Sequence, residues 1–261
     1  MAFAVFIFAL FLKVSTALSS QNITHLFSAV FIFGDSTADS GNNNYINTPF
    51  KADHPPYGED FPGKIPTGRF STGKLMSDIW ASLLGIKQTV PPFLQPNISD
   101  FDIRTGVNFA SAGSGHDDMT TQISQVIPVT KQLYYFKEYI KRLKKVVGIK
   151  EANRIIEGAL VSISGGTNDF TISYYDLPSR RDNFSMDDYQ DYILKKLQNF
   201  INMFPPVELE ESIKKTGGYP GRSEKEPPST LMWTMFYLAQ VCRTTVPPPF
   251  SIQISDPTIS E

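Results

Sequence analysis

Ser36 is the first residue whose position suggests chemistry, because it directly follows the apolar run 29–33 and a Gly34-Asp35 pair. A small residue and a polar residue in this position turn the chain sharply at the carboxyl end of a strand. Open α/β sheets bind their ligands outside that end. A serine hydroxyl placed there can attack a bound substrate, provided that another group takes its proton. On its spacing alone, Gly-Asp-Ser is an ordinary turn, and the nucleophile interpretation depends on other segments.

Two later segments, 106–115 and 160–169, repeat this layout, since each is an apolar run that ends in a glycine-rich polar turn. If the three run ends lie side by side in a parallel sheet, they place Ser36, the backbone of Gly113 and the side chain of Asn168 around one crevice. Taken singly, Gly113 is consistent with a plain turn glycine and Asn168 with a helix cap or an Asx turn. The order of the three segments is what favours a site.

In this order the segments resemble the GDSL esterase/lipase family of plants, within the wider SGNH hydrolases. Residues 55–62 and 66–71 also look like the plant branch of that family. The resemblance runs from about Val30 to Phe204.

The resemblance implies a role for each of the three residues. Ser36 would be the nucleophile and would donate its N–H to the oxyanion formed during ester attack, and Gly113 and Asn168 would supply the other donors. One such preorganised donor contributes about 3–4 kcal/mol to catalysis. Gly113 lets the backbone approach closely, and Asn168 offers an amide N–H without adding charge. Thr37 stands where the family's name has leucine, which leaves these roles unchanged.

The family's proton acceptor is missing from this sequence. In the family, a histidine near the C-terminus takes the serine proton and is held by an aspartate three residues before it. The histidines here are His25, His54 and His116, and none has an aspartate at that spacing. Asp117 and Asp118 adjoin His116, but neighbours on a loop seldom orient each other's side chains into a relay. We therefore expect no histidine to replace the base, and we expect His25 and His54 to lie at the surface.

Apolar spacing predicts the elements that would position these residues. Strands are expected near residues 29–33, 107–110 and 160–164, alternating with helices. The alternation predicts an α/β fold with a parallel sheet flanked by helices, a three-layer sandwich like that of SGNH hydrolases, incomplete at the C-terminus. The apolar helix faces, with their aromatics expected in the core, are Leu75, Ile79, Leu83 and Ile86; Leu133, Phe136, Ile140, Leu143 and Val147; and Tyr189, Ile193, Leu197 and Phe200.

Composition divides the chain into three parts. Residues 1–19 are typical of a secretory signal peptide, because their apolar run is too short to span a bilayer, which takes about 20 residues. Residues 20–204 are expected to form the N-terminal part of the hydrolase domain. Residues 205–261 form a proline-rich tail without periodicity, so we expect the sheet to lose its next strands, leaving an unpaired edge that favours aggregation. We interpret the tail as the result of a frameshift, a retained intron, an exon error or a splice variant.

The remaining composition narrows the range of partners. The net charge of −2 argues against nucleic acid, and the basic residues in 137–145 fit a solvated helix face. The single cysteine allows no internal disulfide. The sequence has no metal-spaced Cys/His cluster and no phosphate loop, so we expect no metal and no cofactor. Asn22, Asn97 and Asn183 occupy N-glycosylation patterns, which agrees with secretion, and no transmembrane segment remains once the leader is removed.

The sequence therefore predicts a secreted serine esterase/lipase of the plant type, which hydrolyses carboxylic esters of lipids or acetylated compounds through Ser36 and then water. Because the Asp-x-x-His block is absent, we expect little or no activity from this chain. The alternative is a non-catalytic decoy that holds a lipid or a carbohydrate in the crevice without cutting it.

Overall fold

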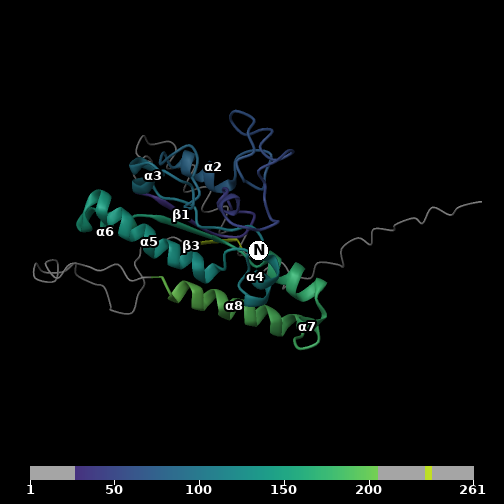
Figure 1. Ribbon diagram of the computed structural model, residues 1–261. Helices are drawn as coiled ribbons and strands as arrows, with labels where there is room; N and C mark the ends of the chain where they lie inside the picture. The colour runs from purple at the N-terminus through teal and green to yellow at the C-terminus, as the bar shows by residue number, and fades with distance from the viewer. Residues whose placement is uncertain (1–26, 205–232, 237–261) are drawn as a thin grey trace, which may run out of the picture.

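A parallel sheet lies at the centre of the structure (Figure 1). The computed structural model describes residues 27–204 and 233–236. Neighbouring strands pair in parallel in the order β1 (Val30–Gly34), β2 (Leu160–Ser164) and β3 (Trp233–Phe236). Every residue of β1 is buried, which agrees with the continuous apolar run that defines it.

Helices surround the sheet and connect its strands. In chain order they are η2 (Asn42–Tyr45, a 3-10 helix), α2 (Met76–Leu83), α3 (Asp100–Thr105), α4 (Asp118–Ser124), α5 (Val129–Val147), α6 (Ile149–Glu157), η3 (Asp169–Asp176, a π-helix), α7 (Pro178–Arg181) and α8 (Met186–Asn202).

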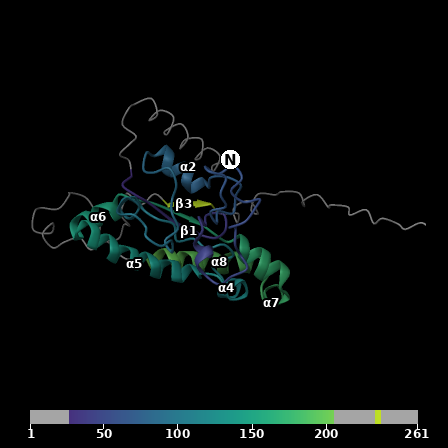
Figure 2. The same cartoon turned by 45° about the horizontal axis from the view of Figure 1, so that its top comes forward.

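The sheet separates two apolar layers, because alternate residues of β1 face opposite sides. Phe31 and Phe33 belong to the larger layer, which also contains side chains of α5, α6 and α8. Val30 and Ile32 belong to the smaller layer, together with Ala81 of α2. Figures 1 and 2 show α5 and α8 on one side of the strands and α2 on the other. The predicted three-layer α/β sandwich is confirmed.

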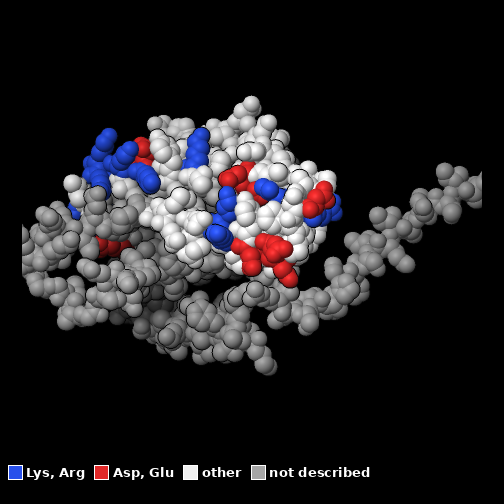
Figure 3. Space-filling view, turned by 90° about the horizontal axis from the view of Figure 1, so that it is seen from below, with Lys and Arg blue, Asp and Glu red and all other residues white. Residues whose placement is uncertain are grey.

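The apolar faces predicted for α5 and α8 are also confirmed. Leu133, Phe136 and Leu143 of α5 are buried, and so are all four predicted residues of α8. The opposite face of α5 is solvated, as expected, since Lys137 and Lys141 are exposed. Figure 3 views the molecule from below, and its basic side chains lie in separate groups with acidic ones beside several of them.

The face predicted for α2 is wrong in part. Leu75 is buried, but Ile79 and Leu83 are 40% and 68% exposed. The buried face carries Asp78, whose carboxylate binds the Arg69 guanidinium through Nε at 2.8 Å. This buried ion pair, and not the apolar stripe, sets the rotation of α2.

Residues 107–110 do not form the full strand that the sequence predicts. They run beside β1 through a parallel bridge between Ile32 and Asn108, and the Phe109 N–H donates to the Ile32 carbonyl oxygen at 2.7 Å. The Asn108 side chain accepts from the Ala110 N–H at 2.8 Å. Such a local bond competes with the backbone ladder and shortens the pairing.

The expectation that no strand from the tail would join the sheet is also wrong. Residues 233–236 form β3, which pairs with β2 from Val161 to Ser164 and covers the edge expected to be open. Tryptophan, threonine and phenylalanine in this segment favour strands, and ladder bonds use only the backbone. The signal peptide predicted for residues 1–19 and the rest of the tail lie outside the described residues.

Candidate active site

The Ser36 turn begins where β1 ends. Gly34 has a φ of 136°, and a Cβ added to it would lie 1.8 Å from the carbonyl oxygen of Ser164, so only glycine fits. The Asp35 N–H donates to the same oxygen at 3.0 Å. Ser36 follows and is half-buried. Within the described part of the chain, neither its hydroxyl nor its N–H has a hydrogen-bond partner.

The buried Asp35 carboxylate shapes this turn. Its Oδ1 accepts from the Thr37 N–H at 3.0 Å and from the Thr37 hydroxyl at 2.7 Å. The N–H groups of Ala38 and Asp39 donate to the Asp35 carbonyl oxygen at 3.1 and 2.9 Å. Burial raises the pKa of the Asp35 carboxyl above its ordinary value. Asp35 therefore fixes the conformation of the loop that carries Ser36.

Gly113 lies in a buried turn and has a φ of 84°. A Cβ added there would lie 3.2 Å from the Cβ of Ser124, so both the backbone conformation and the space favour glycine. The Gly113 N–H has no acceptor among residues 27–204 and 233–236.

Polar side chains of the Ser36 loop hold the Gly113 segment from one side. We call this set the upstream clamp: Asp39, Asn42 and Asn43. Asp39 Oδ2 accepts from the Ala112 N–H at 3.0 Å, and Asn43 Nδ2 donates to the Ala112 carbonyl oxygen at 2.9 Å. Asn42 Nδ2 donates to the carbonyl oxygens of Asn108 and Ala110 at 2.9 and 2.8 Å. Burial raises the pKa of the Asp39 carboxyl to about 6.

Asn168 stands at the start of η3, beyond the carboxyl end of β2, and is half-buried. Its Nδ2 donates to the Ser114 carbonyl oxygen at 2.9 Å, which leaves one amide hydrogen without a partner in the described residues. The Ser114 hydroxyl donates to the Gly34 carbonyl oxygen at 2.8 Å. Ser114 therefore links the Asn168 amide to the end of β1, and the three predicted segments do meet at one edge of the sheet.

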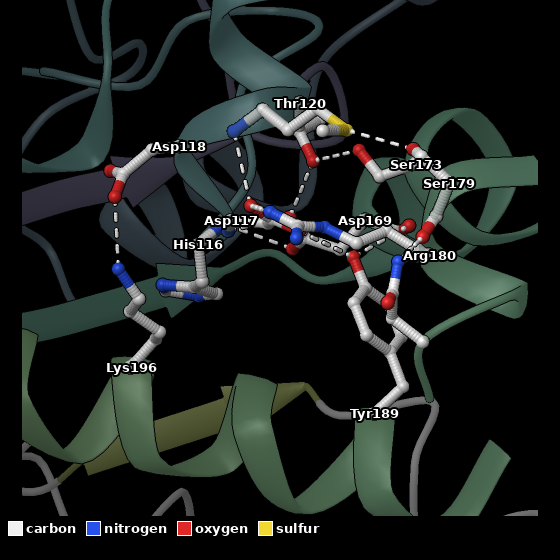
Figure 4. A network of polar contacts seen from close by, with 12 residues as sticks. His116, Asp117, Asp118, Thr120, Asp169, Ser173, Ser179, Arg180, Tyr189 and Lys196 are labelled. Carbon is white, nitrogen blue, oxygen red and sulfur yellow. Dashed lines mark hydrogen bonds and ion pairs between the residues drawn. The ribbon is translucent and has the colours of Figure 1, made fainter. Parts of the chain in front are cut away.

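A second set of polar groups holds the far end of the Gly113 segment (Figure 4). We call this set the downstream clamp: Asp117, Asp169 and Arg180. The Asp169 carboxylate accepts from the N–H groups of His116 and Asp117 at 2.9 and 2.8 Å and from the Thr120 hydroxyl at 2.8 Å. Asp117 binds the Arg180 guanidinium through two hydrogen bonds of 2.8 Å. Burial raises the pKa of the Asp169 carboxyl to about 6.

The His116 ring is buried, and neither of its nitrogens has a hydrogen-bond partner in the residues that the structure describes. It lies beside Phe200, with ring centroids 6.1 Å apart, and burial lowers its pKa to about 4. The Asp117 carboxylate binds Arg180, and the Asp118 carboxylate binds Lys196 at 2.9 Å. As expected, neither aspartate orients the His116 ring.

The comparisons with known proteins agree with the three motifs. A family model described as GDSL-like lipase/acylhydrolase matches residues 30–216. The chain belongs to this family. Two Arabidopsis thaliana GDSL esterase/lipase proteins are 52% and 54% identical to it over 202 and 200 residues, which cover 77% and 75% of this chain and 56% of each relative. Another is 57% identical over 178 residues, 67% of this chain and 49% of the relative.

This GDSL family chain spans about half the length of the curated relatives that it matches. The family match ends at residue 216, beyond Phe204, where the motifs had placed the end of the resemblance. Residues 27–204 and 233–236 contain no group of three or more histidine, cysteine, aspartate or glutamate side chains that could hold a metal ion. No helix within the same residues is long and apolar enough to cross a membrane.

Sequence reasoning found the three motif residues of this family chain but missed the groups that hold them. The acidic clamp residues Asp39 and Asp169 stand inside the motifs, and both are fully buried. An aspartate or asparagine within a run of glycines reads as a turn residue, so its long-range bonds are invisible in the pattern. Gln132, a buried residue of α5, was also missed, because it belongs to none of the motifs.

Proposed function

We propose that Ser36 attacks carboxylic esters, of lipids or of acetylated compounds, with Gly113 and Asn168 as oxyanion donors. The observation that carries the proposal is a set of unpaired donors: the N–H groups of Ser36 and Gly113 and one Asn168 amide hydrogen, each lacking a partner among the described residues. Donors left unpaired at the carboxyl ends of parallel strands suit a developing negative charge.

The chemistry is an acyl transfer in two halves. The Ser36 hydroxyl oxygen bonds to the ester carbonyl carbon while its proton passes to a base, and the carbonyl oxygen becomes the oxyanion. Collapse of this intermediate re-forms the carbonyl and expels the alcohol, which takes up a proton. Water then attacks the acyl group on Ser36 in the same way, releases the acid and restores the serine. This scheme requires no cofactor.

The scheme needs a base that takes the Ser36 proton, and the histidines of this chain are poorly suited to that role. No histidine follows His116 in the sequence, and both His116 ring nitrogens are buried. Removing the histidine of a serine hydrolase triad costs about 10⁶ in turnover, while oxyanion donors and binding alone retain about 10³–10⁴ over water. We therefore propose that this chain turns over esters slowly.

The buried His116 also favours a second candidate function, a non-catalytic decoy that binds a lipid or an acetylated sugar without cutting it. Either protein would be a secreted glycoprotein, with residues 1–19 as signal peptide and 20–204 as the hydrolase part. The exposure of Asn97 and Asn183, both in acceptor patterns, supports this extension.

The test uses the full chain with a p-nitrophenyl ester and a tagged fluorophosphonate, with and without imidazole as an external base. Without imidazole, the proposal expects hydrolysis near background. With imidazole, it expects labelling, and hydrolysis above the rate of imidazole alone, and Ser36→Ala should abolish both. Ser82→Ala, on α2, is the matched control and should behave as wild type. Ester binding without any Ser36-dependent reaction would support the decoy. Brisk turnover without imidazole that Ser36→Ala removes would show that another base serves.

A further inference from the structure

We propose that Gln132 is a positioning residue that keeps the Ser36 turn in register with Gly113 and Asn168. Gln132 lies in the first turn of α5 and is fully buried. The catalytic role of Ser36, Gly113 and Asn168 rests on the function proposed above, but their relative placement is a property of the fold.

The Gln132 amide closes a cyclic pair with one residue of β1. Its Oε1 accepts from the Gly34 N–H at 2.9 Å, and its Nε2 donates to the Gly34 carbonyl oxygen at 2.9 Å. Both the oxygen and the nitrogen of the Gln132 amide therefore bond to Gly34, the residue two places before Ser36. Because Gly34 also ends β1, this pair fixes the point from which the serine turn departs.

The same amide reaches the two oxyanion segments through Ser114. Gln132 Nε2 lies 3.4 Å from the Ser114 hydroxyl, which itself donates to the Gly34 carbonyl oxygen at 2.8 Å. Ser114 directly follows Gly113, and its carbonyl oxygen accepts from Asn168 Nδ2 at 2.9 Å. One side chain on α5 thus joins the three segments that carry the site.

A buried polar side chain can also contribute to stability alone, and α5 carries such a side chain for comparison. Tyr139 lies on the same helix and is fully buried, and its hydroxyl donates to the Ile103 carbonyl oxygen. Ile103 belongs to α3, outside the three motif segments. Tyr139→Phe therefore removes one buried side-chain bond to the backbone without touching the register of Ser36.

The experiment compares Gln132→Met with Tyr139→Phe in the full chain. The proton and nitrogen resonances of the amides of Ser36, Gly113 and the Asn168 side chain are recorded, together with their hydrogen exchange. Gln132→Met should shift all three signals and speed their exchange, whereas Tyr139→Phe should leave them in place. In imidazole, Gln132→Met should also lower kcat for the p-nitrophenyl ester by about 100-fold with KM little changed, the effect of a misplacement of about 1 Å.

Unchanged site resonances in a folded Gln132→Met chain would overturn the proposal, and so would shifts of equal size in Tyr139→Phe. If Gln132→Met does not fold, Ser114→Ala is used instead. This variant removes only the bonds of the Ser114 hydroxyl to the Gly34 carbonyl oxygen and to Gln132, and the Gly113 and Asn168 signals must then move. Hydrolysis that Ser36→Ala leaves unchanged would defeat the proposed function instead. The resonances would still decide the role of Gln132.

Discussion

The two clamps hold the same segment, on either side of Gly113, with different kinds of group. The upstream clamp works mainly through the side-chain amides of Asn42 and Asn43, which donate to backbone carbonyl oxygens. The downstream clamp works through the carboxylates of Asp117 and Asp169 and the Arg180 guanidinium. Neutral amides hold their bonds at any ordinary pH, whereas buried charges depend on their partners and on protonation.

This difference means that the two sides of the site should fail in different ways. Loss of an upstream amide should remove a fixed amount of stability under all conditions. Loss of Arg180 should leave the Asp117 carboxylate buried without its cation, which is far more costly. Gly34 stands apart from both clamps, because it ends β1 and joins the serine turn to Ser164 and Ser114.

The largest effect is expected from Gly34→Ala, because this residue lies at the end of β1, where the serine turn packs against Ser164. The new Cβ would lie 1.8 Å from the Ser164 carbonyl oxygen, so β1 and β2 must separate. We expect the free energy of unfolding to fall by at least about 4 kcal/mol, measured by urea denaturation. Gly148→Ala is the control, because it shares a positive φ but meets nothing within 4 Å, and it should cost about 1 kcal/mol. Equal losses for the two variants would contradict the steric argument.

Arg180→Met tests the downstream clamp directly. The Asp117 side chain is 0% exposed, so removal of Arg180 leaves its carboxylate buried with fewer donors. We expect a loss of about 3 kcal/mol in the free energy of unfolding. Arg154→Met removes an exposed pair with Glu151 and should cost less than about 1 kcal/mol. A loss for Arg180→Met as small as that of the control would mean that the downstream clamp contributes little.

His116→Phe tests the pH dependence beside the downstream clamp. The folded chain keeps the ring neutral down to about pH 4, whereas the unfolded chain protonates it below its ordinary pKa of 6.5. Protons therefore favour the unfolded state in this window, and stability is lost as the pH falls from 6.5 towards 4. Phenylalanine keeps an aromatic ring beside Phe200 and cannot take up a proton.

The quantity to follow is the free energy of unfolding of His116→Phe minus that of wild type. Between pH 8 and pH 4 this difference should rise by up to about 3 kcal/mol. Thermal denaturation across this range measures the difference, and the changes shared by both proteins cancel. A constant difference between His116→Phe and wild type at all pH values would contradict the lowered pKa of the folded ring.

The comparison of the clamps also shows where sequence reasoning works. The strands β1 and β2 and the buried face of α8 follow from apolar spacing, because burial alone decides them. The face of α2 does not, because the buried pair between Asp78 and Arg69 outweighs two exposed apolar side chains, Ile79 and Leu83. Periodicity cannot reveal a partner that lies elsewhere in the chain.

The same limit applies to the candidate site. Ser36, Gly113 and Asn168 could be named from three motifs in order, and the structure brings their segments together. The hydrogen-bond partners of Asp169 and Gln132 could not be predicted, because these bonds join residues far apart in sequence. The strand β3 was missed for a related reason, since its pairing with β2 depends on backbone groups that any sequence carries.

Asn43→Ala is expected to have the smallest effect, and it sharpens the contrast between the clamps. The variant removes the Nδ2 bonds to the carbonyl oxygens of Phe50 and Ala112, at 2.8 and 2.9 Å, and the bond that Oδ1 accepts from the Ser111 hydroxyl. We expect a loss of about 2 kcal/mol, because two buried carbonyl oxygens lose a donor but no charge is left unpaired. The loss should be the same at pH 5 and pH 8 and at low and high salt. The neighbouring Asn44→Ala removes one bond, to Thr67 at 3.2 Å, and should cost about 1 kcal/mol. Urea denaturation under each condition measures these differences, and a marked dependence of the Asn43→Ala loss on pH would show that the upstream clamp is governed by Asp39 and not by its amides.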